Sequence, residues 1–591
     1  MDLDAGLREH FGFAAFRPGQ REACEAAIAG RDVTVVMPTG SGKSLCYQLP
    51  ALLCEDLAIV VSPLVALMQD QVDALRVRGL GDSVALVNAQ QDAQANAAAL
   101  AAAAAGELRL LYVSPERFAS PGFVERLRTV AIGLFVVDEA HCVSQWGHDF
   151  RPDYFRLADA ARYLGARSII ASTATATPRV AKDIVRRLGL RDPLEVATGF
   201  DRPNLAWAVA RPAAQDKRRL LARELGREGA LPAIVYAGTR AGTQEIATEL
   251  ATALGEEVVA YHAGLDRERR AAAQRRFLAD EVRVVVATNA FGMGVDKPNV
   301  RTVVHATAPS SLEAYYQEAG RGGRDGAPAR AVLLAEARDK ALHVHFIRRD
   351  ELDERLPGSV AALLAERSDD RGRFAIELGA LAAAVGCSAD QARAVIGHLA
   401  SAGVVEPSPS APDRLAGRLA RRFDRRAEGL CRAAMAEGSR ARWRQYREIW
   451  GYVEGGDCRR RSILRHFGDR SEPLAQGPCC DVCDGALLPA LEPPDPASFG
   501  DLDEAIEAVV ACARPAAGRT TCAEILHGAR TKKISRNSYD GVPGYGQFSS
   551  LRRADIVARI DALIAEGRLQ ASSGPYPVLA LPPHKAPLAA A

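Results

Sequence analysis

The sequence lacks the segments that direct a chain into or across a membrane. Its first 10 residues contain no basic start followed by an apolar run, and no stretch approaches the roughly 18 apolar residues that span a bilayer. We therefore expect a cytoplasmic protein, associated with the nucleoid if the source is bacterial, with no membrane partner.

A strong net charge and abundant cysteine are missing as well. The net charge of +2 does not by itself indicate a nucleic-acid-binding protein. The 12 cysteines in 591 residues are too few for a secreted disulfide scaffold, and Cys46, Cys54 and Cys142 stand singly in apolar runs, so they are expected to be buried thiols. Charge is concentrated locally: residues 413–470 hold sixteen arginines and eight acidic residues, which indicates either a surface that attracts phosphate or a solvated helical face.

The length of 591 residues exceeds what one hydrophobic core can organise, and roughly three to five domains are expected. Short β-branched runs alternate with helix-like stretches in two blocks, separated by a polar crossing near residues 201–215. This rhythm is typical of parallel sheets covered by helices. The predicted strands are Val33–Val36, Ala58–Val61, Leu108–Val113, Leu134–Val137 and Ser168–Ala171 in the first block, and Ala233–Tyr236, Val258–Tyr261, Val282–Ala287 and Thr302–His305 in the second.

Beyond about residue 341 no strand is predicted until the C-terminal region. Apolar positions from Leu378 onward, with a turn at Gly386 and Ser388 as N-cap, have helix-turn-helix spacing. Pro/Ser-rich segments at 407–412 and 485–498 are predicted linkers. A helix-like stretch at 551–567 followed by two short strands at 568–579 is typical of a winged helix.

A phosphate-binding loop follows the first predicted strand. Its glycines let backbone N–H groups close around phosphates, while Lys43 reaches the β and γ oxygens and Ser44 binds Mg²⁺. Met37 stands where the full motif has Gly, so the loop has the looser form of this pattern. The expected ATP-binding residues of the loop are Thr39, Gly40, Ser41, Gly42, Lys43 and Ser44.

Two acids close another predicted strand, and two arginines lie far downstream. Asp138 is expected to bind Mg²⁺ with Ser44, and Glu139 to orient and deprotonate the attacking water. A simple pair of acids at a helix N-cap does not explain why they end a strand about a hundred residues after the loop. In the second block, Arg321 and Arg324 lie in a glycine-rich loop and are candidates to stabilise charge on the γ-phosphoryl oxygens.

Together these motifs resemble those of the RecQ family, DEAH-box DNA helicases of superfamily 2. The resemblance covers about residues 7–326. It includes Leu7-Arg-x-x-Phe11-Gly-x-x-x-Phe16-Arg17-Pro-Gly-Gln20, Ser62-Pro-Leu, Ser114-Pro-Glu-Arg117, Asp138-Glu-Ala-His141, Ser172-Thr-Ala-Thr175 and Ala287-Thr-x-Ala-Phe291-Gly-Met-Gly-Val-Asp296-Lys-Pro.

The resemblance implies further nucleotide and DNA contacts. Gln20 would read the adenine edge, Phe16 and Arg17 would flank the nucleotide, and Asp296 would complete the ATP site. An aromatic-rich loop after the acids would stack on single-stranded bases and report that contact to the ATP site. Its candidate DNA-binding residues are Trp146, His148, Phe150 and Arg151; the alternative is that the aromatics belong to the core.

The cysteine cluster resembles the zinc site of that family but departs from its spacing. Cys458 precedes two arginines as expected, whereas the remaining three are Cys479, Cys480 and Cys483, and Gly477 stands where the first of the triplet is usual. Four thiolates suffice for tetrahedral Zn²⁺ if the backbone bends. Cys479 is the least secure ligand, with Cys431 as a substitute.

The implied architecture is α/β, with two tandem RecA-like parallel-sheet lobes followed by helical zinc-binding and winged-helix domains. In the last domain Arg552, Arg553 and Tyr576 are candidate duplex contacts, with a purely structural role as the alternative. The predicted boundaries are 1–205 (first lobe), 206–345 (second lobe), 346–412 (helix-turn-helix-like insertion), 413–490 (zinc-binding region) and 498–585 (winged helix).

The implied activity is ATP-dependent unwinding of DNA, with 3′ to 5′ translocation on a single strand, in repair or recombination. The cofactors are ATP, Mg²⁺ and Zn²⁺, the substrates are single-stranded and forked or duplex DNA, and the expected state is a monomer. A single-strand-binding protein is a candidate partner that the residues do not specify. The alternatives are a DEAH-type RNA helicase and a DNA-binding scaffold whose ATPase has decayed.

Overall fold

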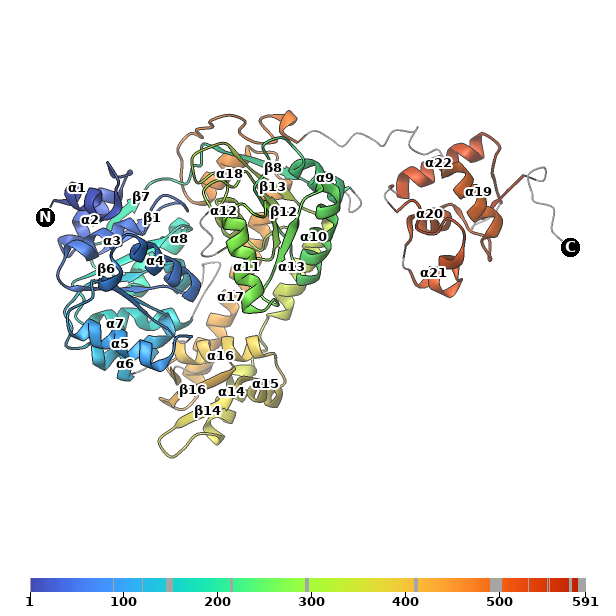
Figure 1. Cartoon of the computed structure of the whole chain (residues 1–591). Helices are drawn as coiled ribbons and strands as arrows, with labels where there is room; N and C mark the ends of the chain where they lie inside the picture. The colour runs from blue at the N-terminus through green and yellow to red at the C-terminus, as the bar shows by residue number, and fades with distance from the viewer. Residues whose placement is uncertain are drawn as a thin grey trace. The chain divides into compact units, whose positions relative to one another are not determined.

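The computed structural model describes residues 2–88, 90–119, 121–144, 152–212, 216–292, 297–408, 413–488, 502–529, 531–549, 551, 553–572 and 577–582. The chain forms two compact units (Figure 1). One comprises residues 1–211 and 225–488, and the other residues 212–224 and 489–591. In the described part of the chain, no helix is long and apolar enough to cross a bilayer.

The first lobe is built on a seven-stranded parallel sheet with the order β3-β4-β2-β5-β6-β1-β7. Its central strands are buried along their whole length, because one hydrophobic cluster covers each face. The strands are β1 (Val33–Val36), β2 (Leu57–Val61), β3 (Val84–Val87), β4 (Leu110–Val113), β5 (Ile132–Val137), β6 (Ser168–Thr173) and β7 (Leu194–Ala197). The covering helices are α1 (Leu3–Gly6), α2 (Gln20–Ile28), α3 (Leu45–Leu53), α4 (Val65–Val77), α5 (Ala93–Ala104), α6 (Pro121–Leu127), α7 (Leu157–Tyr163) and α8 (Pro178–Leu188).

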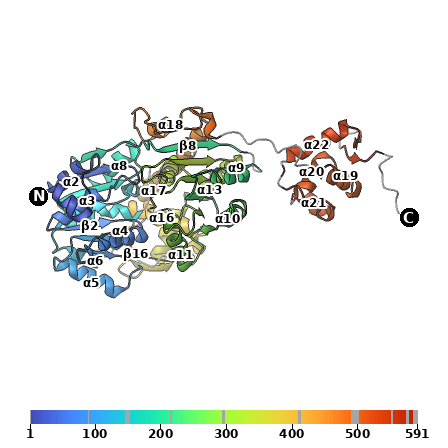
Figure 2. The ribbon, with the colours of Figure 1, turned by 45° about the horizontal axis from the view of Figure 1, so that its top comes forward.

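The second lobe repeats this plan with a six-stranded parallel sheet, β10-β11-β9-β12-β13-β8. The two predicted parallel-sheet lobes are therefore confirmed. Its strands are β8 (Leu205–Ala210), β9 (Ala233–Tyr236), β10 (Val258–Tyr261), β11 (Val284–Ala287), β12 (Thr302–His305) and β13 (Ala329–Leu334). The helices of this lobe are α10 (Arg240–Leu254), α11 (Arg267–Leu278), α12 (Leu312–Ala319) and α13 (Ala337–Arg349). The helix α9 (Lys217–Leu225) belongs, except for its last residue, to the other unit. Figure 2 shows the edge strand β8 of the second sheet running beneath α18 (Arg459–His466).

The interpretation of residues 201–215 as a polar crossing was wrong in part, because β8 lies there. This strand pairs in parallel with β13 along its full length and is almost entirely buried. Its alanine-rich sequence, Leu-Ala-Trp-Ala-Val-Ala, carries few of the β-branched residues that mark a strand. The strands β3, β7 and β13 were likewise not predicted from the sequence.

A small module, residues 351–424, is inserted after the second lobe. Two helices are joined by a turn in which Gly386 has a φ of 71°, and Ser388 caps the second helix reciprocally with Gln391. The expectation that strands end near residue 341 was wrong, because three antiparallel strands, β14-β16-β15, accompany the helices. The elements are α14 (Leu356–Glu366), β14 (Arg373–Glu377), α15 (Leu378–Val385), α16 (Ala389–Ser401), β15 (Val405–Ser408) and β16 (Arg414–Leu419).

The predicted linker at 407–412 is corrected in its first two residues. Pro407 and Ser408 lie in β15 and pair with Gly417 and Ala416 of β16, while 409–412 lie outside the described residues. Proline is tolerated there because β15 is an edge strand. Gly417 is required on the facing strand, since a Cβ would lie 2.6 Å from the Glu406 carbonyl oxygen.

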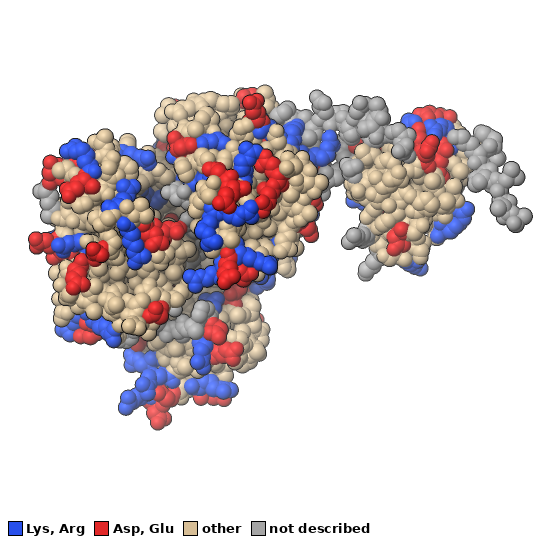
Figure 3. Space-filling view, in the orientation of Figure 1, with Lys and Arg blue, Asp and Glu red and all other residues tan. Residues whose placement is uncertain are grey.

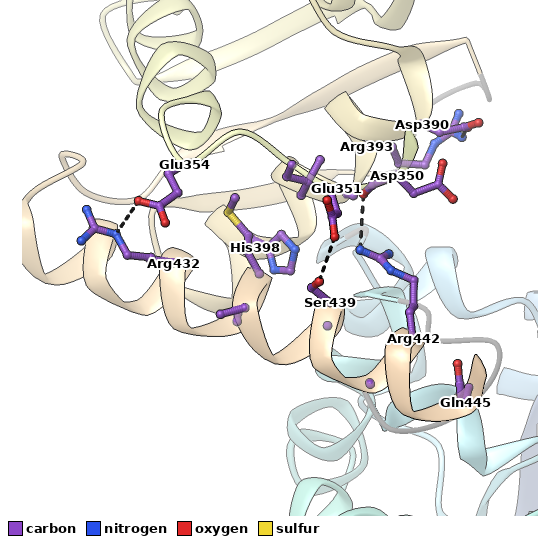
Figure 4. A pocket seen from close by; sticks show the side chains of 17 residues that line it. Asp350, Glu351, Glu354, Asp390, Arg393, His398, Arg432, Ser439, Arg442 and Gln445 are labelled. Carbon is purple, nitrogen blue, oxygen red and sulfur yellow. Dashed lines mark hydrogen bonds and ion pairs between the residues drawn. The ribbon is translucent and has the colours of Figure 1, made fainter. Parts of the chain in front are cut away.

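Two helices follow this module, and the first of them packs on both the module and the second lobe. They are α17 (Arg425–Glu454) and α18 (Arg459–His466). Aromatic side chains of α17 and α12 share one buried cluster with β8. A cavity of about 580 Å³ lies between α16 and α17, with His398 and Arg442 among the side chains that line it (Figure 4).

The C-terminal unit contains a compact helical domain ending in a two-stranded antiparallel hairpin, so the predicted winged helix is confirmed. One apolar cluster fills its centre. The elements are α19 (Leu502–Cys512), α20 (Arg519–His527), α21 (Lys532–Arg536), α22 (Arg553–Ala565), β17 (Gln570–Ala571) and β18 (Leu579–Ala580).

Candidate functional site

The phosphate loop lies between β1 and α3 in the first lobe. Gly40 and Gly42 have φ angles of 81° and 83°, a region that favours glycine. The carbonyl of Pro38 accepts hydrogen bonds from the Ser41 hydroxyl at 2.6 Å and from the Lys43 ammonium at 3.4 Å. Burial lowers the pKa of Lys43, although the charges of Glu139 and Asp138 oppose this shift. The loop therefore holds a half-buried lysine beside two acids.

The residues upstream of the loop pack directly onto it. Arg17 donates from Nη1 to the Gly40 carbonyl at 2.6 Å. The Gln20 amide donates to the carbonyls of Ser41 and Gly42, both at 3.1 Å, and accepts from the Arg17 N–H at 2.8 Å. Phe16 is partly buried under the guanidinium of Arg21, 4.7 Å from its ring centre. Of the predicted nucleotide contacts, Arg17 and Gln20 are thus fixed against the phosphate loop.

The two acids follow β5 at the carboxyl end of the sheet, where parallel α/β sheets bind ligands. Asp138 is buried, and its pKa is raised to about 7 by burial and by the charge of Glu139. Glu139 has a φ of 48°, an unusual conformation for a residue with a side chain. His141 Nδ1 lies 3.3 Å from Glu139 Oε2 and 3.0 Å from Thr173 Oγ1, which links the acids to the end of β6.

The two predicted arginines of the second lobe differ in position. Arg324 faces the phosphate loop: its Cγ is 3.4 Å from where a Cβ on Gly40 would lie. Arg321 is buried in its own lobe and donates from Nη1 to the Gly292 carbonyl. The structure therefore brings Arg324, but not Arg321, to the phosphate loop. For Arg321 a role on the phosphate stays a prediction.

Several predicted contacts lie outside the described residues. These are Trp146, His148, Phe150 and Arg151 of the aromatic-rich loop, Asp296 of the ATP site, and Arg552 and Tyr576 of the winged helix. Arg553 is described: it begins α22, its side chain is 54% exposed, and its Nη1 lies 3.8 Å from Glu524 Oε1. It is thus accessible to a ligand in solution.

The four cysteines of the predicted zinc site come together. Cys458, Cys479, Cys480 and Cys483 each present a sulfur, and all four sulfurs lie within 4.8 Å of one another. The Sγ atoms of Cys479 and Cys480 are 3.7 and 3.9 Å from that of Cys458, close to the ~3.8 Å edge of a tetrahedron with zinc–sulfur bonds near 2.3 Å. These residues fit a zinc ion.

The bend that adjacent cysteines need is present at Gly477, whose φ is 116°. Cys431 is buried in the core of the inserted module, apart from the other four. The zinc loop also continues the second sheet, because Trp207 of β8 forms a parallel bridge with Cys480. Its N–H donates to the Cys479 carbonyl at 3.2 Å, and its carbonyl accepts from the Asp481 N–H at 3.0 Å.

Many of the sixteen arginines in residues 413–470 already have acidic partners. The pairs include Arg418 with Glu406, Arg432 with Glu428, Arg440 with Glu437, Arg459 with Asp481 and Arg460 with Asp201. Figure 3 likewise shows basic and acidic side chains interspersed over the face that it presents. The local basic excess does not form a separate basic face in this view. Two of these arginines, Arg459 and Arg460, are buried and structural, a role that no pattern in the sequence predicted.

Family models match four successive parts of the chain. The models are DEAD/DEAH box helicase (residues 17–184), Helicase conserved C-terminal domain (216–326), RecQ zinc-binding (420–484) and RQC domain (501–590).

Curated relatives agree with these matches. The chain is 32% identical over 580 residues to "ATP-dependent DNA helicase RecQ" of Bacillus subtilis (strain 168), covering 97% of this chain and 81% of that protein. It is 34% identical over 484 residues to "Probable ATP-dependent DNA helicase RecS" of the same organism, covering 81% and 92%. With "ATP-dependent DNA helicase RecQ" of Pasteurella multocida (strain Pm70) the identity is 43% over 353 residues, 59% of this chain and 55% of that protein. The chain therefore belongs to the RecQ family of ATP-dependent DNA helicases.

Proposed function

We propose that this chain hydrolyses ATP in the seam between its two lobes and uses the cycle to move 3′ to 5′ along single-stranded DNA and unwind duplex DNA in repair or recombination. One observation carries the proposal: Arg324 of the second lobe lies against Gly40 of the phosphate loop in the first. A site completed by two lobes is sensitive to their relative movement, so hydrolysis and stepping are coupled.

Different residues of the seam carry out different parts of ATP hydrolysis. The backbone of Thr39 to Ser44 and the Lys43 ammonium bind the phosphates, and Glu139 orients the attacking water and accepts its proton. The Arg324 guanidinium stabilises charge on the γ-phosphoryl oxygens. Ser44 and Asp138 hold Mg²⁺, which neutralises phosphate charge when bound.

The DNA contacts come from two regions. We assign single-strand contact to Trp146, His148, Phe150 and Arg151, and duplex contact to the winged helix, including Arg553. Opening a base-pair step costs on average ~1.4 kcal/mol, which hydrolysis of one ATP per step can supply. The zinc ligands Cys458, Cys479, Cys480 and Cys483 stabilise the helical region that follows the second lobe.

We also propose an oligomeric state, a partner and a cellular location for the protein. We expect the chain to act as a monomer, which sedimentation of the protein alone and on DNA tests directly. A single-strand-binding protein is a candidate partner. As an enzyme of chromosomal DNA it would work in the cytoplasm, at the nucleoid in a bacterium.

Strand separation tests the function. Duplexes with a 3′ tail, a 5′ tail, a fork or a junction are compared for the native chain and for Lys43→Ala, with Lys182→Ala, at an exposed lysine of the same lobe, as the control. We expect unwinding of 3′-tailed and forked DNA, none by Lys43→Ala, and unchanged DNA binding by that variant. Equal unwinding of RNA duplexes would instead favour an RNA helicase, and DNA binding without DNA-stimulated ATPase would favour a scaffold.

A further inference from the structure

The segment between the lobes holds an arginine that the family motifs do not explain. Arg202 lies between β7, the last strand of the first sheet, and β8, an edge strand of the second. Its guanidinium donates to three carbonyls of one loop: to Gly320 at 2.8 Å, Gly322 at 2.7 Å and Gly323 at 3.3 Å. One side chain of the connecting segment therefore binds the loop that carries Arg324.

These acceptors explain why an arginine stands at this position. The loop follows α12, and the last carbonyls of a helix have no partner within the helix and carry partial negative charge. Burial lowers the pKa of Arg202, yet a guanidinium remains charged in proteins and presents five donors in a rigid fork. A lysine would keep the charge and lose the fork.

The loop has little freedom to adapt if Arg202 is removed. Asn204 donates to the carbonyls of Gly323 and Ala327, both at 2.8 Å. Gly323 has a φ of 58°, and a Cβ there would collide with the Asn204 amide. The opposite side of the loop meets the phosphate loop, because a Cβ on Gly320 would lie 2.8 Å from Thr39 Oγ1. A shift of this loop therefore changes its distance from the phosphates.

The zinc region fixes the backbone around Arg202. The buried Arg460 donates from Nη1 to Asp201 Oδ1 at 2.6 Å and to the Arg202 carbonyl at 2.7 Å, and from Nη2 to the Leu205 carbonyl at 2.7 Å. Asp201 Oδ2 accepts in turn from the Leu474 N–H at 2.7 Å. The connecting segment is thus held on one side by the zinc region and holds the arginine loop on the other.

We propose that Arg202 is a positioning residue for ATP hydrolysis, which holds the loop of residues 320–323 so that Arg324 faces the phosphate loop. The inference rests on the proposed function, because it assigns hydrolysis to the seam and charge stabilisation to Arg324. It adds a residue that binds the loop carbonyls and acts on the rate through another side chain. Arg460 supports it from the zinc region.

The test is a double-mutant cycle in the full chain. The variants are Arg202→Ala, Arg324→Ala and the two combined. For each variant, kcat and KM of the DNA-stimulated ATPase are measured. Melting temperature, zinc content and affinity for a fluorescent ATP analogue are measured on the same samples. A misplacement of about 1 Å costs on the order of 100-fold, so Arg202→Ala should lower kcat by about that factor while KM changes little. Arg202→Lys should restore the rate only in part.

The cycle separates this inference from the proposed function. We expect Arg202→Ala to have no further effect in the Arg324→Ala background, because both act on the same step. An equal loss in both backgrounds, or a normal kcat for Arg202→Ala beside an inactive Arg324→Ala, overturns the inference alone. A normal kcat for Arg324→Ala overturns the assignment of Arg324 and the inference with it. If Arg202→Ala does not fold, Arg202→Lys takes its place in the cycle with the same expected pattern.

Discussion

Arg324 of the second lobe lies over Gly40 of the first, with its Cγ 3.4 Å and its Cδ 3.7 Å from the position of a Cβ on that glycine. A side chain at residue 40 would therefore meet Arg324 and would also strain a backbone whose φ is 81°. Glycine at position 40 of the first lobe therefore leaves room for Arg324 of the second lobe. This pair makes the seam sensitive to lobe movement.

The first prediction concerns Arg324 itself. Arg324→Ala should lower kcat of the DNA-stimulated ATPase by about 10³-fold or more, the range found for arginines supplied to a transferring phosphoryl group. KM should change little, because the guanidinium acts on charge that develops in the transition state. Arg338→Ala, an exposed arginine of the same lobe, is the control, and steady-state kinetics is the measurement. A fall in ATP affinity with normal kcat would contradict the assigned role.

The second prediction concerns the zinc ligands. Cys479→Ser should release zinc to a competing chelator faster than the native chain, since one of four thiolates is lost. Cys431→Ser, in the core of the inserted module, should retain the metal as the native chain does. Zinc is measured by elemental analysis after dialysis against chelator. Full retention by Cys479→Ser would mean that three cysteines hold the ion with a different fourth ligand.

The third prediction concerns pH and the inserted module. Burial and the charge of Arg442 lower the pKa of His398 to about 4, whereas an unfolded histidine titrates near ~6.5. Between these values the unfolded state binds more protons, so the free energy of unfolding falls as pH falls from about 6.5 to 4. At pH 5 the loss should be on the order of 2 kcal/mol.

Hydrogen exchange of the α16 amides reports this local stability. The difference in opening free energy between pH 7.5 and pH 5 should shrink in His398→Gln. His345→Gln changes an exposed histidine of α13 and should leave the difference as in the native chain. If His398→Gln has the same pH dependence as the native chain, His398 does not carry the effect.

The fourth prediction concerns duplex binding by the winged helix. Arg553→Ala should weaken duplex affinity and reduce the slope of log K against log salt by about 1, because one phosphate contact is lost. Arg519→Ala is the matched control: it removes a half-exposed arginine of the same domain that pairs with Asp561 at 2.8 Å. Fluorescence anisotropy over a range of salt concentrations measures both. An unchanged salt slope for Arg553→Ala would leave Arg553 without a phosphate contact.

The sequence was informative where chemistry requires a local pattern. The phosphate loop and the acids after β5 place their reactive groups within a few residues, and three of the four cysteines lie within residues 479–483, so local spacing predicts them. The strands of the sheet centres are equally legible, because burial on both faces demands continuous apolar runs, as in Ile132–Val137.

Contacts between residues far apart in the chain could not be predicted from local patterns. The carbonyls that Arg202 binds are 118 to 121 residues away in the sequence, and Asp201-Arg202-Pro203 has no pattern that identifies them. β8 is a strand because β13 and the zinc loop lie on its two sides. In the inserted module, β14 and β16 are half-exposed and polar, so only their pairing reveals them.

Through the bridge between Trp207 and Cys480, zinc binding also keeps an edge strand of the second sheet covered. An outermost strand offers unpaired N–H and C=O groups that can recruit another chain, and on β8 the backbone of Cys479 and Asp481 occupies the positions beside Trp207. Removal of zinc would loosen this contact and expose the backbone N–H and C=O groups of β8. The demetallated protein should therefore self-associate as well as lose activity, and light scattering during chelation would follow it.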